Sequence, residues 1–295
     1  MRILVVGCGY VGERAALAWA RQGHEIVAVT RSQSRADQWQ LRGWESIVTD
    51  IAQSGALRSL PEVDLCLYAV GYDRASGLPR RQVTVDGLGR VLSALRGLVG
   101  RLIYISSSSV YGQDAGEWVN EDSKCEPRTE SGQLCLAAEQ LVQAAARDMS
   151  ATILRLSGIY GPNRLLARVA QLRNGDPLGG RGDAWLNLIH VDDVVNALQR
   201  LAEPQTVERE SGACQLLLLS DEQPVLRSTF YTELARLVQA PAPSFDSSLP
   251  VRSGAINVGK RCDSQRIREV LGLVLRFPTV AVGLPQAVAA TPDLT

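Results

Sequence analysis

Residues 1–21 read MRILVVGCGYVGERAALAWAR, and this stretch decides the fold. Its apolar run, residues 3–6, is typical of a central parallel strand buried on both faces. Three glycines follow at G-x-G-x-x-G spacing, and an apolar helical pattern continues behind them. The first glycine permits a tight turn, the second lets backbone approach a pyrophosphate and the third lets the helix pack closely on the strand. This strand–turn–helix context favours dinucleotide binding over an incidental turn. We expect the cofactor to contact Gly7, Gly9, Tyr10, Val11 and Gly12.

The composition excludes several classes of protein. The chain has 295 residues and a formal net charge of +0, so it lacks the electrostatic footprint of a nucleic-acid or anionic-membrane binder. Its six cysteines form no C-x-x-C pair and it has two histidines, so we expect no metal site. No segment approaches the roughly 18 apolar residues of a membrane helix, and the first residues lack the layout of a signal peptide. We therefore expect a reduced, cytoplasmic protein with no nucleic-acid or membrane partner.

Strand patterns and helix patterns alternate along the chain. Strands are expected at residues 24–30, 46–50, 63–71, 101–105, 151–156 and 216–219, and helices at 83–98, 133–147, 165–172, 228–239 and 264–272. This alternation predicts an α/β protein with a doubly wound parallel sheet, the Rossmann fold. Residues 187–195 are expected to begin a further helix. In the helix at 133–147, the apolar residues form one face, so we expect Glu139 to lie on the opposite, solvent-exposed face.

The same pattern predicts two portions. A dinucleotide-binding core is expected over residues 1–163, and it also receives about 186–222. A small substrate-binding portion takes most of residues 164–295. The polar stretch 112–132 is too irregular for an element, so we expect a loop at the carboxyl ends of the strands, where α/β sites lie.

The residues after the second strand predict which dinucleotide binds. An acidic residue about 20 positions past the glycines would bind the hydroxyls of the adenosine ribose. Arg31, Ser32 and Arg35 stand there instead. Because a guanidinium can fork onto a ribose 2′-phosphate, NADP is preferred to NAD as the cofactor. The alternative interpretation is a solvated loop of basic residues.

Two further segments are expected to line the cofactor. Asp50 ends the third strand, where its carboxylate can accept a hydrogen bond from the adenine amino group while Ile51 packs on the ring. Ala69, Val70 and Gly71 end the fourth strand and would pass beside the cofactor phosphates.

Several motifs along the chain match one family pattern. They are the glycine turn, Asp50-Ile51, SSSSVYG (106–112), RLSGIYGP (155–162), NLIHVDDVV (187–195) and GKRCDSQRIREVLG (259–272). Together they resemble the extended short-chain dehydrogenase/reductases, also called the NAD-dependent epimerase/dehydratase family. The resemblance implies a Rossmann core that holds a dinucleotide at the carboxyl edge of its sheet. It also implies a small-molecule substrate such as a nucleoside-diphosphate sugar, and a homodimer formed through the helices near 83–98 and 133–147.

The chain departs from this family at the active site. The glycine turn is one residue shorter than the usual G-x-x-G-x-x-G. The family pattern has Y-x-x-x-K on the helix after the serine strand, in which the tyrosine exchanges the substrate proton and the lysine lowers the tyrosine pKa. Ser131 stands at the tyrosine position and Cys135 at the lysine position. An alkanol is a far weaker acid than a phenol, and a thiol carries no positive charge. Ser108 and Ser109 replace the acidic pair of dehydratases, so that reaction is not expected.

Two functions stay open. An oxidoreductase or epimerase with a displaced acid/base would use Ser107 to hold the substrate oxygen, and Tyr111, Tyr160 or Lys124 to move the proton. Each of these also has a structural interpretation, as a packed tyrosine or a solvated lysine, and His190 is expected to make a structural hydrogen bond. The alternative function is a non-catalytic NADP(H)-binding sensor, which the lost tyrosine and lysine suggest directly. A structural module that binds no nucleotide would require the glycine turn to be accidental.

Overall fold

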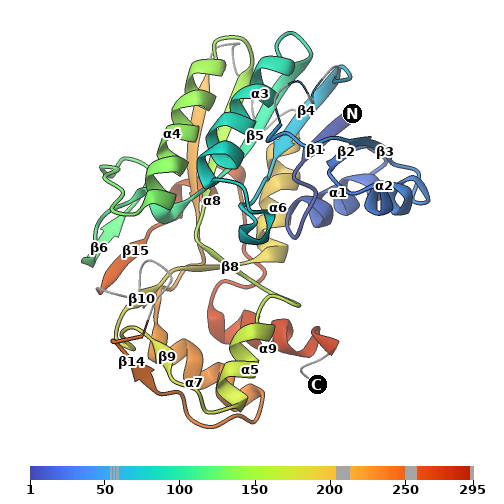
Figure 1. Ribbon diagram of the computed structural model, residues 1–295. Coiled ribbons are helices and arrows are strands. Elements are labelled where there is room, and N and C mark those ends of the chain that lie inside the picture. Colours follow the sequence, from blue (N-terminus) through green and yellow to red (C-terminus); the bar gives the residue numbers. More distant parts are fainter. Residues whose placement is uncertain (54, 56, 58–59, 204–212, 250–257, 293–295) are drawn as a thin grey trace. The chain divides into compact units, whose positions relative to one another are not determined.

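The computed structural model describes residues 1–295 except 54, 56, 58–59, 204–212, 250–257 and 293–295. The chain divides into two compact units (Figure 1). Unit 1 comprises Met1–Val110, Glu130–Arg155 and Val195–Leu217, and unit 2 comprises Tyr111–Thr129, Leu156–Val194 and Leu218–Thr295. Residues 111–129 and 156–163, which we expected in the Rossmann core, therefore belong to unit 2. Residues 204–212 of the expected range 186–222 lie outside the described part of the chain.

Unit 1 contains most of a seven-stranded sheet in the order β12-β7-β5-β4-β1-β2-β3. Its strands are β1 (Arg2–Val6), β2 (Glu25–Thr30), β3 (Glu45–Val48), β4 (Val63–Tyr68), β5 (Val99–Ser107), β7 (Ser150–Leu156) and β12 (Cys214–Leu219). β1 pairs in parallel with β2 and β4, and the pairs β2–β3 and β4–β5 are also parallel. The doubly wound parallel sheet predicted from the sequence is confirmed. The chain changes direction across the sheet after β3, so the topological switch point lies between β1 and β4.

Helices cover both faces of this sheet (Figure 1). They are α1 (Gly12–Arg21), α2 (Gln33–Gln40), the π-helix η2 (Gln82–Asp86), α3 (Gly87–Ala94), α4 (Glu130–Ala145) and α6 (Val191–Ala202), with short 3-10 turns η1 (Arg74–Ser76) and η3 (Ser108–Val110). Leu4 and Val6 of β1 share an apolar cluster with side chains of α3 and α4. Val5 points to the opposite face, where a Cβ on Gly12 of α1 would lie 3.2 Å from its Cγ1. Since successive strand residues point to opposite faces, the two helix layers lie on opposite sides of the sheet.

A buried ion pair joins α4 to β7 within unit 1. Arg155 donates from Nη2 to Glu139 Oε2 at 2.6 Å and from Nε to Oε1 at 2.9 Å, and the Ser106 hydroxyl donates to Oε1 at 2.5 Å. Only 1% of the Glu139 side chain is exposed. The prediction that Glu139 faces outward is wrong. The helix pattern alone would place its carboxylate in water, but Ser106 of β5 and Arg155 of β7 bind the carboxylate and compensate the cost of burying it.

The described residues of unit 2 form short strand pairs and helices. The pairs are β8 (Gly158–Tyr160) with β11 (Leu188–His190), β6 (Ala115–Val119) with β15 (Gly259–Cys262), β10 (Trp185–Leu186) with β13 (Val225–Leu226), and β9 (Leu178–Gly179) with β14 (Phe245–Asp246). The helices are α5 (Leu166–Arg173), α7 (Arg227–Leu237), α8 (Gln265–Leu271) and α9 (Val280–Ala289). Side chains of α5, α7 and α9 form its apolar core. None of the helices described in either unit meets the length and hydropathy needed to cross a bilayer.

The structure corrects two expectations about elements and shows one helix that the sequence pattern does not predict. The stretch 112–132 is not a loop throughout, because β6 pairs in parallel with β15 from the C-terminal part of the chain. The segment 187–195 begins as strand β11, and α6 starts only at Val191. α9 was not predicted, because Pro285 lies inside it and proline normally ends a helix pattern.

Candidate functional site

The carboxyl ends of neighbouring strands in unit 1 meet at one edge of the sheet. Val6 of β1 lies opposite Tyr68 of β4, and Tyr68 lies opposite Tyr104 of β5. The segments that follow the strands at this edge are residues 7–12, 31–35, 50–51 and 69–71, and β5 ends at the same edge with residues 105–107. Ligands of open α/β sheets bind outside this edge at the switch point. The sheet therefore brings together the residues that the sequence predicts for the cofactor.

The glycine turn, residues 7–12, is closely packed at two of its three glycines. Gly7 has a φ of 89°, and a Cβ there would lie 2.5 Å from the Ala69 carbonyl carbon. A Cβ on Gly12 would lie 2.5 Å from the Gly7 carbonyl oxygen, whereas a Cβ on Gly9 would meet no atom within 4 Å. Packing thus requires the first and third glycines, and open space lies in front of the second. The N-cap residue of α1, Val11, makes no side-chain hydrogen bond, while the Glu13 N–H of the first turn donates to the Gly9 carbonyl oxygen at 2.9 Å.

An arginine network fixes α2 to the glycine turn. Arg35 Nη2 donates to the Cys8 carbonyl oxygen and to Glu13 Oε2, both at 3.0 Å. Arg42 donates to the other Glu13 oxygen at 2.8 Å. Burial alone would raise the pKa of Glu13, but the hydrogen bond from Arg42 and the charge of Arg35 lower it overall. Arg35, one of the residues expected at a 2′-phosphate, is therefore held by the turn itself.

The other residues expected near the adenosine are more open or serve their own loop. The Arg31 guanidinium is half exposed and lies 3.6 Å from a carboxylate oxygen of Asp73. Ser32 is the N-cap of α2. Asp50 accepts from the backbone N–H of Ala52 at 3.0 Å, and Ile51 is buried in the cluster beneath α3 and α4. Arg31 is thus the exposed cation beyond the end of β2.

The residues at the tyrosine and lysine positions lie at the start of α4. Arg80 Nη1 donates to the Ser131 hydroxyl at 3.1 Å. Burial raises the pKa of the Cys135 thiol, and the Ser109 hydroxyl and the charge of Arg80 offset only part of that effect. The thiol is consequently neutral near pH 7. Ser107, at the end of β5, accepts from the backbone N–H of Ser109 at 3.1 Å. Arg80 is the charged group that contacts Ser131, and no local sequence pattern singles it out.

Tyr111 and Lys124, the other catalytic candidates, belong to unit 2. Tyr111 is 3% exposed, and its carbonyl oxygen accepts from Lys260 Nζ at 3.4 Å. Lys124 is exposed and its ammonium lies 2.6 Å from Glu126 Oε1. Sequence reasoning missed Lys260, whose burial lowers its pKa and which has no ion pair among the residues that the structure covers. The one signal for it was that the chain has only two lysines.

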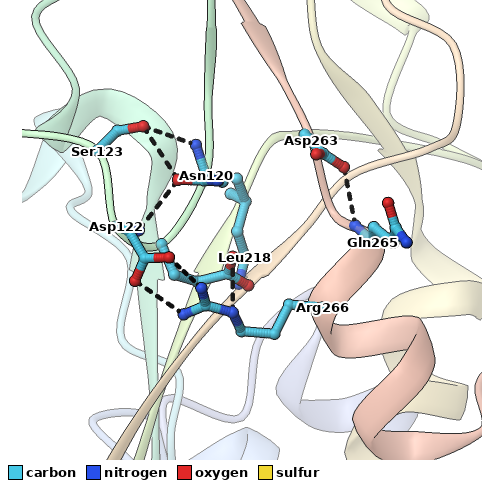
Figure 2. Close-up of polar contacts among 8 residues, drawn as sticks. Asn120, Asp122, Ser123, Leu218, Asp263, Gln265 and Arg266 are labelled. Atoms are coloured by element: carbon cyan, nitrogen blue, oxygen red, sulfur yellow. Dashed lines mark hydrogen bonds and ion pairs between the residues drawn. The ribbon is translucent and has the colours of Figure 1, made fainter.

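The segment that contains Tyr111 and Lys124 is fastened by α8 (Figure 2). Arg266 binds both carboxylate oxygens of Asp122, and its Nε lies 3.7 Å from the buried Glu121. Glu121 also accepts the backbone N–H of Leu218 at 2.8 Å. Asn120 accepts from the Ser123 hydroxyl at 3.2 Å and closes the turn. These bonds tie residues 120–123 to Arg266 of α8 and to Leu218.

The IHVDD segment of unit 2 has a structural arrangement. His190 is fully buried, with its ring 4.0 Å from that of Phe277 and 5.1 Å from that of Tyr160. Its Nδ1 accepts from the backbone N–H of Asp192 at 3.2 Å. Asp193 accepts from the backbone N–H groups of residues 276 and 277. Tyr160 is 1% exposed and packs against α9, where only a glycine, Gly283, leaves room for its hydroxyl. In the described part of the chain, no three His, Cys, Asp or Glu side chains gather at a metal site.

The sheet order, the switch point and the glycine turn define an α/β protein of the Rossmann type. A family model described as the NAD dependent epimerase/dehydratase family matches residues 3–211, and the chain belongs to this family. No curated protein matches it at a significant level.

Three solved structures share the fold over nearly their full length. A functionally unknown conserved protein from Silicibacter pomeroyi is 26% identical with a TM-score of 0.78, and the alignment covers 98% of this chain and 99% of that one. MoeE5 in complex with UDP-glucose and NAD is 24% identical with a TM-score of 0.78, and 97% of each chain is covered. UDP-glucuronic acid 4-epimerase from Bacillus cereus in complex with NAD is 17% identical with a TM-score of 0.79, and 100% of this chain and 99% of that one are covered. At these identities the latter two show the fold alone.

Proposed function

We propose that the chain binds NAD or NADP at the glycine turn of unit 1 and acts as an oxidoreductase or epimerase on a nucleotide sugar. The observation that carries the proposal is the open space at Gly9. The glycines on either side of it in the motif, Gly7 and Gly12, have no room for a side chain, whereas a Cβ on Gly9 would meet no atom within 4 Å. Membership of the NAD dependent epimerase/dehydratase family supports it, and so does the likeness to structures that were solved with a UDP-sugar and NAD. When bound, the cofactor would supply hydride transfer to or from a substrate carbon.

NADP is our preferred cofactor. Arg35 is held by the glycine turn, so Arg31 is the guanidinium that would turn to a 2′-phosphate. The ion pair between Arg31 and Asp73 is long and solvent-exposed, so it contributes little to stability. Arg31 can therefore leave Asp73 and bind the phosphate with little loss of free energy. Titration of the protein with NADPH and with NADH, followed by nucleotide fluorescence, tests this preference. Equal affinities for the two nucleotides would remove this preference, and tighter binding of NADH would make NAD the cofactor.

We further propose that Ser107 holds the substrate oxygen and that Tyr111 or Lys124 moves the proton. Ser131 and Cys135 do not provide this chemistry, because an alkanol is a far weaker acid than a phenol and the Cys135 thiol is neutral. Incubation with UDP- and dTDP-sugars and either nicotinamide nucleotide, followed by separation of the products, tests the reaction. If Tyr111→Phe and Lys124→Ala turn over such a substrate as fast as the parent, neither residue is the acid/base.

The second candidate function is a non-catalytic NADP(H)-binding sensor. The specific observation that favours it is the start of α4, where a neutral thiol and a serine bound by Arg80 replace the tyrosine and lysine. Tight nucleotide binding without hydride exchange to any sugar nucleotide would support the sensor. Exchange of the nicotinamide C4 hydride with any such substrate would exclude it.

A homodimer through α3 and α4 also belongs to this proposal. The two helices pack together within unit 1, where a Cβ on Gly89 would lie 3.9 Å from Leu141 Cδ1. α3 also borders an open cavity of 660 Å³, whose lining includes Asp86, Gly89, Arg90 and Ser93. Analytical ultracentrifugation tests the assembly, and a monomer at micromolar concentration would exclude it.

A further inference from the structure

Arg80 is a half-buried cation without a carboxylate partner in the described part of the chain. Its Nη1 donates to the Ser131 hydroxyl, and its Cζ lies 4.3 Å from the centre of the Tyr72 ring. Neither contact neutralises its charge. The next residue, Arg81, differs in both respects, because it is exposed and its guanidinium faces Asp86 at 3.9 Å. Arg80 therefore keeps a full positive charge available to a ligand.

The guanidinium of Arg80 also keeps free donors. Nη1 is the only one of its nitrogens that makes a hydrogen bond to a described residue, which leaves Nε and Nη2 without a protein acceptor there. These two nitrogens form the planar edge of a guanidinium that pairs with the two oxygens of a carboxylate. The contacts with Ser131 and Tyr72 hold the rest of the group.

The position of Arg80 is set by two segments at the carboxyl edge of the sheet. Tyr72 follows β4 in the loop that continues from residues 69–71, and its hydroxyl donates to the Leu78 carbonyl oxygen at 2.9 Å. This bond folds the loop so that Arg80 reaches Ser131 in the first turn of α4. The N-terminal end of this 16-residue helix carries a partial positive charge, which adds to that of Arg80.

The α4 groups on which Arg80 acts are neutral, and Glu130, the acidic residue of the first turn of this helix, makes no ion pair with Arg80 in the described part of the chain. Ser131 is a hydroxyl, and the Cys135 thiol is protonated because burial raises its pKa. Arg80 itself lowers the pKa of that thiol, which shows that its charge acts at this position. A single guanidinium beside hydroxyl groups balances a single negative charge spread over two oxygens, which is the chemistry of a carboxylate.

We propose that Arg80, assisted by Ser131, forms a subsite for a carboxylate on the substrate. This inference rests on the proposed function, since it assigns the subsite to a nucleotide-sugar substrate. It narrows the substrate class to sugars that carry an acid group, such as uronic acids, and it makes Arg80 a specificity-determining residue.

A matched pair of probes tests the subsite. UDP-glucuronic acid and UDP-glucose differ in having a carboxylate or a hydroxymethyl group on the sugar ring. We expect calorimetry, with nicotinamide nucleotide present, to show that the parent binds UDP-glucuronic acid about 10- to 100-fold more tightly, as a charge-assisted hydrogen-bonded pair provides. Arg80→Gln should abolish this preference and Arg81→Gln should keep it. Arg80→Lys, which retains the charge but not the planar fork, should keep only part of it.

The outcomes separate the subsite from the proposed function. If the parent binds both sugars equally, or if the preference survives in Arg80→Gln, the subsite is wrong and the proposed function stands. Weaker binding of the nicotinamide nucleotide by Arg80→Gln would place Arg80 at the cofactor and also overturn the subsite. If the parent binds neither sugar, the subsite is wrong, and the screen of other UDP- and dTDP-sugars decides whether the proposed function fails as well. Thermal unfolding shows whether Arg80→Gln is folded; if it is not, Arg80→Lys decides, and an unchanged preference in that variant overturns the subsite.

Discussion

Replacing Gly9 with alanine should separate cofactor binding from folding. A Cβ at this position meets no protein atom within 4 Å, and Gly9 is absent from the residues with positive φ. Alanine at a compatible glycine position restricts the unfolded chain, so we expect the free energy of unfolding to stay the same or rise by up to about 1 kcal/mol. The methyl group would occupy the space in which backbone approaches the pyrophosphate. We therefore expect the nucleotide affinity to fall at least about tenfold, or ~1.4 kcal/mol.

The matched control is Gly12→Ala, three residues along the same turn. Its Cβ would lie 2.5 Å from the Gly7 carbonyl oxygen, so backbone must shift and the free energy of unfolding should fall by about 1–3 kcal/mol. Fluorescence titration with NADPH and NADH measures the affinity of each variant, and urea denaturation measures its stability. If Gly9→Ala is as stable as the parent and binds nucleotide equally well, the cofactor does not approach this glycine and the reasoning is refuted.

Three further predictions concern buried charges. Glu139→Gln leaves the buried Arg155 without its anion, so denaturant unfolding should show a loss of about 3–5 kcal/mol; a loss under about 1 kcal/mol would contradict the buried pair. Burial raises the pKa of Asp221 from 3.8 to about 8. Between these two pH values the unfolded chain has lost the Asp221 proton while the folded protein keeps it, so the free energy of unfolding should decline as the pH rises through this range. Asp221→Asn should flatten that decline in urea titrations, and an unchanged slope would contradict it. Burial lowers the pKa of Lys260, so competitive amine labelling with mass spectrometry should give a midpoint below 10.5; a midpoint at or above that value would contradict it.

The Rossmann sheet could be predicted because its signals are local. The central strands β1 and β4 are short apolar runs, and the glycine turn joins the first of them directly to a helix. Packing then uses the glycines as their spacing indicates, since Gly7 and Gly12 have no room for a side chain. Because strands and helices alternate in a parallel sheet, the segments that follow its strands all lie at the same edge. The order of the elements along the chain was therefore enough to predict which segments lie there.

Features that depend on distant partners could not be predicted in this way. β6 is a strand because β15 pairs with it, and no pattern within residues 112–132 records that partner. Glu139 has the position of a solvent-facing residue on its helix, yet Arg155 and Ser106 bury its carboxylate. An arginine in a loop, such as Arg80, has no periodic neighbours, so only the folded chain shows that Ser131 and Tyr72 hold it.

The division into two units has a consequence for any work with fragments of this protein. The chain passes from one unit to the other after residues 110, 129, 155, 194 and 217. Neither unit is a continuous stretch, so no truncation at one end, and no single proteolytic cut, yields either unit whole. A fragment limited to residues 3–211, the span of the family model, would contain β6 without β15 and would lose α7, α8 and α9. Functional dissection of this chain therefore requires point substitutions in the full-length protein.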